Sequence, residues 1–142
     1  TVIAKNFFVS QDEREIATIL FRNVGEISWI NDEDLMDAVT AISGSGPAYF
    51  FLFTEILEKA GVNLGLPENL SKELTRNTFI GSATLVKNSD KSLKELRKNV
   101  TSKGGTTEAA LGTLEKLGLH EMLQKATEEA MKKSKSLSRK PE

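Results

Sequence analysis

Apolar residues recur at helical spacing along most of the chain, and two such stripes flank one polar segment. Leu93, Leu96 and Val100 lie at positions i, i+3 and i+7, which places them on one face of a helix. Ser92 and Glu95 have the spacing of a capping box at its start. The pattern therefore predicts a helix that begins at residue 93 and ends near residue 100.

The polar segment, residues 99–107, reads Asn-Val-Thr-Ser-Lys-Gly-Gly-Thr-Thr. Its two glycines tolerate a positive φ, and its hydroxyl groups can bond to nearby backbone atoms. A second helical stripe follows, formed by Ala110, Leu114 and Leu117. We expect this second helix to begin with Thr106 or Thr107 as its N-cap residue.

Two interpretations of this segment are open. The free N–H groups of a helix N-terminus that follows Gly-Gly and is flanked by hydroxyls can bind a small anion such as a carboxylate. Alternatively, the segment is only a capped corner between two helices. The spacing alone favours the corner, because most hydroxyl-rich turns are no more than turns.

The first thirty residues carry a different pattern. Thr1–Ala4 is a short β-prone run, and Glu26–Ile30 is a second one, with Ile27 and Trp29 on one face. A helical stripe that ends at Gly25 lies between them; it consists of Ile16, Ile19, Leu20 and Val24. A strand, a helix and a strand predict the end of an α/β sheet. We expect its other strands to lie outside this chain, which lacks a starting Met, or to come from another chain.

From residue 31 onward the pattern is helical throughout. Asn31 or Asp32 is expected to cap a helix that the segment Ser43–Pro47 interrupts. The residues of this helix expected to be buried are Leu35, Ala38, Val39 and Ile42. The next helix, residues 48–60, is apolar almost all round, which is typical of a helix buried on both sides within an oligomer. Trp29 and the phenylalanines are expected in the core.

Further helices are expected from Pro67 and from about His120, and the chain then ends in the basic stretch 132–141, which is expected to be a solvated tail. The segment Gly44–Tyr49 imitates a dinucleotide fingerprint, but no strand precedes it and Tyr49 replaces its third glycine. We therefore interpret it as a joint between helices, with an edge that faces a substrate or cofactor as the alternative.

Composition excludes several kinds of site. The chain has 142 residues, a net charge of −1 and no cysteine, so global charge gives no sign of nucleic-acid binding and there is no thiolate site. No apolar run approaches the roughly 20 residues of a membrane span. His120, the only histidine, has no companion ligand at metal-binding spacing. We expect a cytoplasmic protein without a metal.

Three segments, in this order, carry a family resemblance. They read Asp-Ala-Val-Thr-Ala-Ile-Ser-Gly-Ser-Gly-Pro-Ala-Tyr at 37–49, Gly-Val-Asn-Leu-Gly-Leu-Pro at 61–67, and the polar segment at 99–107. Together they resemble pyrroline-5-carboxylate reductase, the oxidoreductase that completes proline biosynthesis. The resemblance spans nearly the whole chain beyond residue 24.

The resemblance implies a mainly α fold. An all-helical dimerisation and substrate-binding domain, residues 31–142, would follow a strand–helix–strand remnant of a Rossmann domain, residues 1–30. The implied reaction is hydride transfer from NADPH or NADH to 1-pyrroline-5-carboxylate, which gives L-proline. Most of the nucleotide site would lie outside this chain, so the chain alone is expected to be inactive. The implied partner is a second copy in an interlocked homodimer, with larger assemblies left open, and no nucleic acid, membrane or metal.

The resemblance also assigns residues by motif position. Thr107 matches the catalytic hydroxyl near the substrate's ring nitrogen, and Thr40 and Val100 match positions close to the nicotinamide. The implied substrate-binding residues are Ser102, Gly104, Gly105, Thr106 and Thr107. Lys103 stands where many relatives have proline, and Thr106 where alanine is commoner. The rival hypotheses are a helical oligomerisation module without catalysis and, more remotely, a hydroxy-acid dehydrogenase, whose usual catalytic Lys or His motif is missing around residues 99–107.

Overall fold

The computed structural model describes residues 1–138, so the basic tail predicted at Arg139–Pro141 lies outside the described residues. The chain forms two compact units. One comprises residues 1–46 together with the helical residues from 125 onward, and the other comprises Pro47–Gln124.

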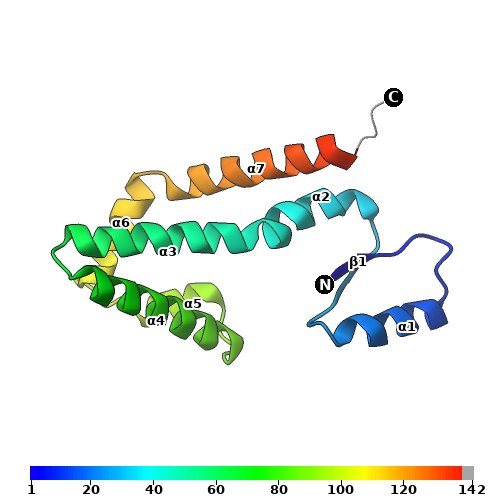
Figure 1. The fold of residues 1–142 in the computed structure, drawn as a ribbon, viewed down its shortest axis with the longest axis horizontal. Coiled ribbons are helices and arrows are strands. Elements are labelled where there is room, and N and C mark those ends of the chain that lie inside the picture. Colours follow the sequence, from blue (N-terminus) through cyan, green and yellow to red (C-terminus); the bar gives the residue numbers. More distant parts are fainter. Residues whose placement is uncertain (139–142) are drawn as a thin grey trace. The chain divides into compact units, whose positions relative to one another are not determined.

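The first unit begins with a small parallel sheet. Strands β1 (Val2–Ala4) and β2 (Ser28–Ile30) pair with Ile3 opposite Trp29, and helix α1 (Gln11–Arg22) connects them (Figure 1). This confirms the strand–helix–strand prediction, with a second strand that begins two residues later than expected. Parallel strands need such a crossover, because a tight turn cannot return the chain in the same direction.

Helix α1 is fixed at its start and along one side. Ser10 and Glu13 form a capping box, in which each side chain accepts a hydrogen bond from the other residue's backbone N–H. The indole Nε1 of Trp29 donates to the Thr18 hydroxyl at 3.1 Å, and the Arg14 guanidinium lies 4.9 Å from the centre of the Trp29 ring system. The helix therefore packs against β2 through a hydrogen bond and a cation–π contact.

The helical segment that follows β2 is irregular. A 3₁₀ turn, η1 (Glu33–Leu35), capped by Asp32, leads into α2 (Met36–Val39) and then into the π-helical turn η2 (Thr40–Gly44). The sequence predicted an interruption near Ser43–Pro47. The structure confirms it: the π-helical turn ends at Gly44, Ser45 forms a bend whose N–H donates to the Thr40 carbonyl at 2.8 Å, and a new helix begins at Gly46.

The expected burial of this segment is partly wrong. Leu35 and Ile42 are 49% and 64% exposed, whereas Ala41 is 2% exposed. The prediction assumed a repeat of 3.6 residues, and the 3₁₀ and π turns depart from that repeat. In the same unit, the hydroxyl of Ser134 on α7 (Leu119–Ser138) donates to an Asp37 carboxylate oxygen at 2.6 Å, so this segment is tied to the last helix.

The second unit is built on two antiparallel helices, α3 (Gly46–Asn63) and α4 (Glu68–Lys87) (Figure 1). Phe50 and Phe79 meet with ring centroids 6.1 Å apart, and the Ser71 hydroxyl donates to the Glu58 carbonyl at 2.7 Å. Helix α3 extends three residues beyond the predicted end at residue 60, and Gly65, at a φ of +96°, reverses the chain.

Of the aromatic residues predicted to form a core, six phenylalanines are exposed within this chain, whereas Trp29 and Phe79 are half-buried. Phe50, Phe51 and Phe53 on α3 are 61%, 65% and 51% exposed, and Phe7 and Phe8 are almost fully exposed. Helix α3 thus packs on α4, but much of its apolar surface is not covered by its own chain. A face of this kind marks an interaction surface.

The remaining helices of the second unit are α5 (Leu93–Asn99) and α6 (Thr106–Lys116). The predicted capping box of Ser92 and Glu95 at the start of α5 is confirmed. The polar segment identified in the sequence is the loop between α5 and α6, so it joins two helices that belong to one compact unit.

Candidate functional site

The loop between α5 and α6 is shaped by its glycines. Val100 closes α5, and the Gly105 N–H donates to the Ser102 carbonyl at 3.0 Å, which makes a tight turn. Gly104 has a φ of +71°, a conformation that side-chain-bearing residues rarely adopt. The positive φ expected of the Gly-Gly pair is therefore found at Gly104 only, because Gly105 has a φ of −85°.

The N-cap of α6 differs from the prediction. The helix begins at Thr106, and Gly105 occupies the N-cap position without any side-chain cap. Neither Thr106 nor Thr107 caps the helix, because both lie inside its first turn. A Cβ atom added at Gly105 would lie 2.4 Å from the Ser102 hydroxyl, so a capping side chain here would require the Ser102 side chain to move.

The start of α6 therefore keeps its donors free. The backbone N–H groups of Thr106, Thr107 and Glu108 donate no hydrogen bond to any residue in the range 1–138. The hydroxyls of Ser102, Thr106 and Thr107 are likewise unbonded within those residues. By contrast, α1 and α5 both begin with complete capping boxes. An uncapped, hydroxyl-rich helix N-terminus is suited to an anionic ligand.

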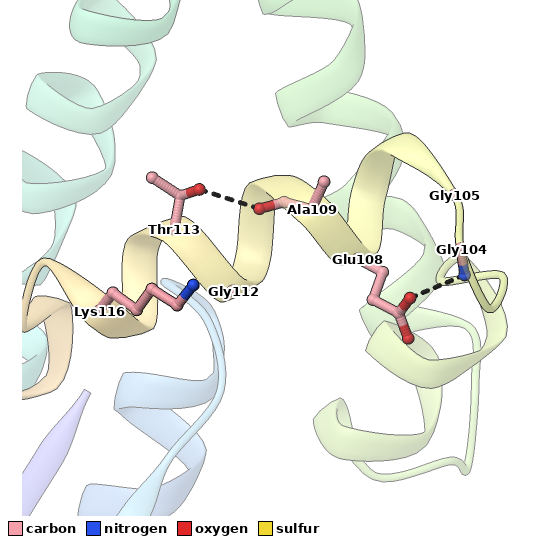
Figure 2. A pocket seen from close by; sticks show the side chains of 7 residues that line it. All are labelled: Gly104, Gly105, Glu108, Ala109, Gly112, Thr113 and Lys116. Carbon is pink, nitrogen blue, oxygen red and sulfur yellow. Dashed lines mark hydrogen bonds between the residues drawn. The ribbon is translucent and has the colours of Figure 1, made fainter.

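One carboxylate already lies on this loop. The Gly104 N–H donates to a carboxylate oxygen of Glu108 at 2.7 Å (Figure 2). This short, charge-assisted hydrogen bond shows that the loop backbone can bind a carboxylate. Sequence reasoning missed Glu108. The signal was an acidic residue three positions after the N-cap residue, the place that a capping box gives to glutamate.

A pocket of about 310 Å³ runs along one face of α6. Gly104 and Gly105 line its loop end, and its lining residues farther along α6 are Glu108, Ala109, Gly112, Thr113 and Lys116 (Figure 2). Gly112 presents no side chain, which leaves space between Glu108 and Lys116. The pocket therefore has a carboxylate towards one end and an ammonium group at the other.

The structure brings most of the predicted site residues together. Ser102, Gly104, Gly105, Thr106 and Thr107 form one continuous loop and first helical turn. Thr107 is half-buried, whereas Ser102 and Thr106 are exposed.

The two residues assigned near the nicotinamide belong to different units. Val100, 63% exposed, directly precedes the loop in the second unit. Thr40 belongs to the first unit, where its hydroxyl donates to the Met36 carbonyl at 2.9 Å. Gly44 and Gly46 both lie within helical turns, so the segment 44–49 lacks the strand-to-helix loop that holds a dinucleotide phosphate.

The described chain offers few other kinds of site. Among residues 1–138, no three His, Asp or Glu side chains gather into a group that could hold a metal ion. None of the helices in that range combines the length and the apolar character needed to cross a membrane.

Comparison with known proteins identifies the family. Residues 33–137 match the family model described as pyrroline-5-carboxylate reductase dimerisation. The chain is 40% identical over 129 residues to the pyrroline-5-carboxylate reductase of Haemophilus influenzae, and the match covers 90% of this chain and 48% of that protein. It is 39% identical over 140 residues to the Synechocystis enzyme, with 99% of this chain and 52% of that protein covered.

Solved structures agree with this match. A pyrroline-5-carboxylate reductase from Coxiella burnetii aligns with a TM-score of 0.92 and 38% identity over 98% of this chain and 52% of its own. The Plasmodium falciparum pyrroline carboxylate reductase, solved with NADP bound, aligns with a TM-score of 0.83 and 39% identity, covering 97% and 52% of the two chains. The chain thus spans about half the length of these relatives. It belongs to the pyrroline-5-carboxylate reductase dimerisation family.

Proposed function

We propose that this chain is the dimerisation and substrate-binding part of a reductase that transfers hydride from NADPH or NADH to 1-pyrroline-5-carboxylate to give L-proline. Residues 31–142 would form the helical domain, and residues 1–30 would correspond to the end of a dinucleotide-binding domain. The family match over residues 33–137 supports this division. A cytoplasmic location stays a prediction.

The free donors at the start of α6 carry the proposal. The substrate is a carboxylate, and the N–H groups of the first turn together with the hydroxyls of Ser102 and Thr106 would bind its oxygens. The Glu108 carboxylate on the Gly104 N–H supports this assignment, because it shows the same chemistry within the chain. Thr107, half-buried in the same turn, would hold the ring nitrogen of the substrate through its hydroxyl.

Single residues of this chain are the proposed contacts of the nicotinamide ring, and segment 44–49 does not fit the phosphates of the nucleotide. Val100 offers an exposed apolar surface directly before the loop, whereas segment 44–49 is helical and forms no phosphate loop. Thr40, whose hydroxyl oxygen can still accept a hydrogen bond, is the second candidate contact. The nucleotide, when bound, supplies the hydride. The residues of this chain would contribute orientation and the exclusion of water from the two reactants.

The dimer would form on the apolar surface of α3 and α4. A groove of about 530 Å³ lies there, and its lining includes Phe50, Phe53, Leu57, Phe79 and Val86. Because Phe50, Phe53, Leu57 and Val86 are exposed in the single chain, a second copy of the chain is the proposed occupant. The description of the matching family as a dimerisation family supports this assignment.

Binding of L-proline to the dimeric chain, measured by calorimetry, tests the carboxylate site. We expect Thr107→Val to weaken binding at least tenfold, the effect of about 1.4 kcal/mol. Thr84→Val, whose hydroxyl bonds only within α4, is the matched control and should bind as the wild type does. Unchanged affinity in Thr107→Val would contradict the assignment. If the wild-type dimer does not bind L-proline, the same variants are compared by kcat/KM in the full-length reductase. A kcat/KM that falls in Thr107→Val but not in Thr84→Val then supports the assignment of Thr107.

The second candidate function is a helical oligomerisation module without catalysis. The exposed apolar surface of α3 favours it as much as it favours the enzyme. Light scattering and ligand binding separate the possibilities: a dimer that also loses L-proline binding in Thr107→Val supports the enzyme. A stable monomer at micromolar concentration would count against both.

A further inference from the structure

A second cavity lies beside the candidate site, between α5 and α6. It has a volume of about 600 Å³, and its charged lining residues are Lys94, Arg97, Lys98, Lys103, Glu108 and Glu115. We name it the basic groove. Glu108 and Gly112 line both the basic groove and the pocket along α6, so the two are neighbours.

The cations of the basic groove are unpaired. The ion pairs between described residues are Lys59 with Glu55 and Lys132 with Glu129, and neither involves the groove. Lys94, Arg97 and Lys98 stand at i, i+3 and i+4, where like charges repel one another on a helix surface. The short helix α5 thus presents three neighbouring positive charges, none of which forms an ion pair between described residues.

Stabilisation of the helix dipole explains only part of this cluster. Arg97 and Lys98 lie in the last turn of α5, where cations are favourable. Lys94 lies in the first turn, where a cation is unfavourable, and Lys103 lies outside the helix in the loop. The carboxylate of Glu108 faces the cluster but is engaged by the Gly104 N–H. Four cations therefore face two carboxylates across one groove.

We propose that the basic groove is a second anion site, distinct from the carboxylate site on the loop, and that it binds a small oligophosphate. Several cations around one cavity favour a ligand with several charged oxygens over a single carboxylate. The volume suits a small molecule. No aromatic side chain lines the groove, so the stacking platform that single-stranded nucleic acids use is missing.

Calorimetric titration of the dimeric chain with inorganic tripolyphosphate at low ionic strength tests this proposal. We expect saturable binding that weakens as salt is raised, and inorganic phosphate should bind at least tenfold more weakly. The variant Lys94→Gln with Lys98→Gln should weaken tripolyphosphate binding at least tenfold. Lys72→Gln with Lys125→Gln removes the same charge from exposed positions outside the groove and should change binding less than twofold.

Three results would overturn the proposal: no saturable binding, equal losses in both double variants, or phosphate binding as tight as that of tripolyphosphate. Thermal unfolding checks that each variant is folded. The two sites are separated by a cross-test, because Thr107→Val should retain tripolyphosphate binding and the groove variant should retain L-proline binding within twofold. If the wild-type chain binds only one of the two ligands, the assignment of the site for the other ligand has failed.

Discussion

Gly105→Ala is the most direct test of how the α5–α6 loop is built. An added Cβ atom would lie 2.4 Å from the Ser102 hydroxyl and 3.1 Å from the Ser102 carbonyl oxygen. Both distances are shorter than the usual contact between carbon and oxygen. The φ of Gly105, −85°, suits alanine, so the backbone angle itself adds no strain.

The expected cost follows from what must move. The Ser102 side chain has to leave its rotamer or rotate away, at about 0.5–1.5 kcal/mol. Alanine is also a poorer N-cap than glycine, which adds about 0.5 kcal/mol. We therefore expect Gly105→Ala to lower the free energy of unfolding by about 1–2 kcal/mol, a factor of about 5–30 in the equilibrium constant.

A double-mutant cycle with Ser102→Ala measures this clash. Urea unfolding at one fixed protein concentration gives the free energy of unfolding of each variant, because dimer stability depends on concentration. Removing the Ser102 hydroxyl should relieve most of the cost of Gly105→Ala, with a coupling of at least about 0.5 kcal/mol. An equal cost of Gly105→Ala in both backgrounds, or no cost at all, would refute this account of the loop.

Two further predictions concern the helices around the site. In Gly61→Ala the added Cβ would lie 2.2 Å from the buried Ser71 hydroxyl, so urea unfolding should show a loss of about 1–3 kcal/mol that is smaller in a Ser71→Ala background. In the capping box of α5, the Ser92 hydroxyl and backbone N–H donate to Glu95 and lower the pKa of its carboxyl below the ordinary 4.5. This stabilisation is present above that ordinary value and is lost as pH falls through the lowered one. The difference in thermal midpoint between wild type and Ser92→Ala should therefore be larger at pH 7 than at pH 3, and a constant difference would argue against the capping box as its source.

Local features of the fold were predictable from the sequence. The capping box of Ser92 and Glu95 and the strand–helix–strand order depend on neighbouring residues alone, and both are confirmed. The positive φ of Gly104 follows equally from local chemistry, because few other residues adopt it.

Burial was less predictable, because it depends on surfaces that a single chain does not contain. Phe51 was expected in a core and is 65% exposed. The apolar pattern of its helix predicted burial within an oligomer, and the surface that would cover Phe51 there is not part of a single chain. Ile42 is exposed for another reason. The π turn at Thr40–Gly44 changes the helical repeat, and the residue pattern of the sequence does not predict a π turn.

In the candidate site, too, local features were predictable from the sequence and three-dimensional contacts were not. The residues that form the loop were found from their types and order, but the N-cap was not, because Ser102 would clash with a side chain at Gly105 and that contact is three-dimensional. Glu108 was overlooked since a lone glutamate in a first helical turn is common. Its role became visible only from the 2.7 Å bond to Gly104.

The bond between Glu108 and Gly104 has a consequence for the energetics of binding. Fixing a backbone residue in one conformation costs about 1–2 kcal/mol, and a mobile loop would meet that cost each time a ligand bound. Here the carboxylate of Glu108 accepts a hydrogen bond from the Gly104 N–H within the chain itself, so the loop is ordered when the chain folds. A ligand that reaches the first turn of α6 would find its donors preorganised, and more of its interaction energy would remain as affinity.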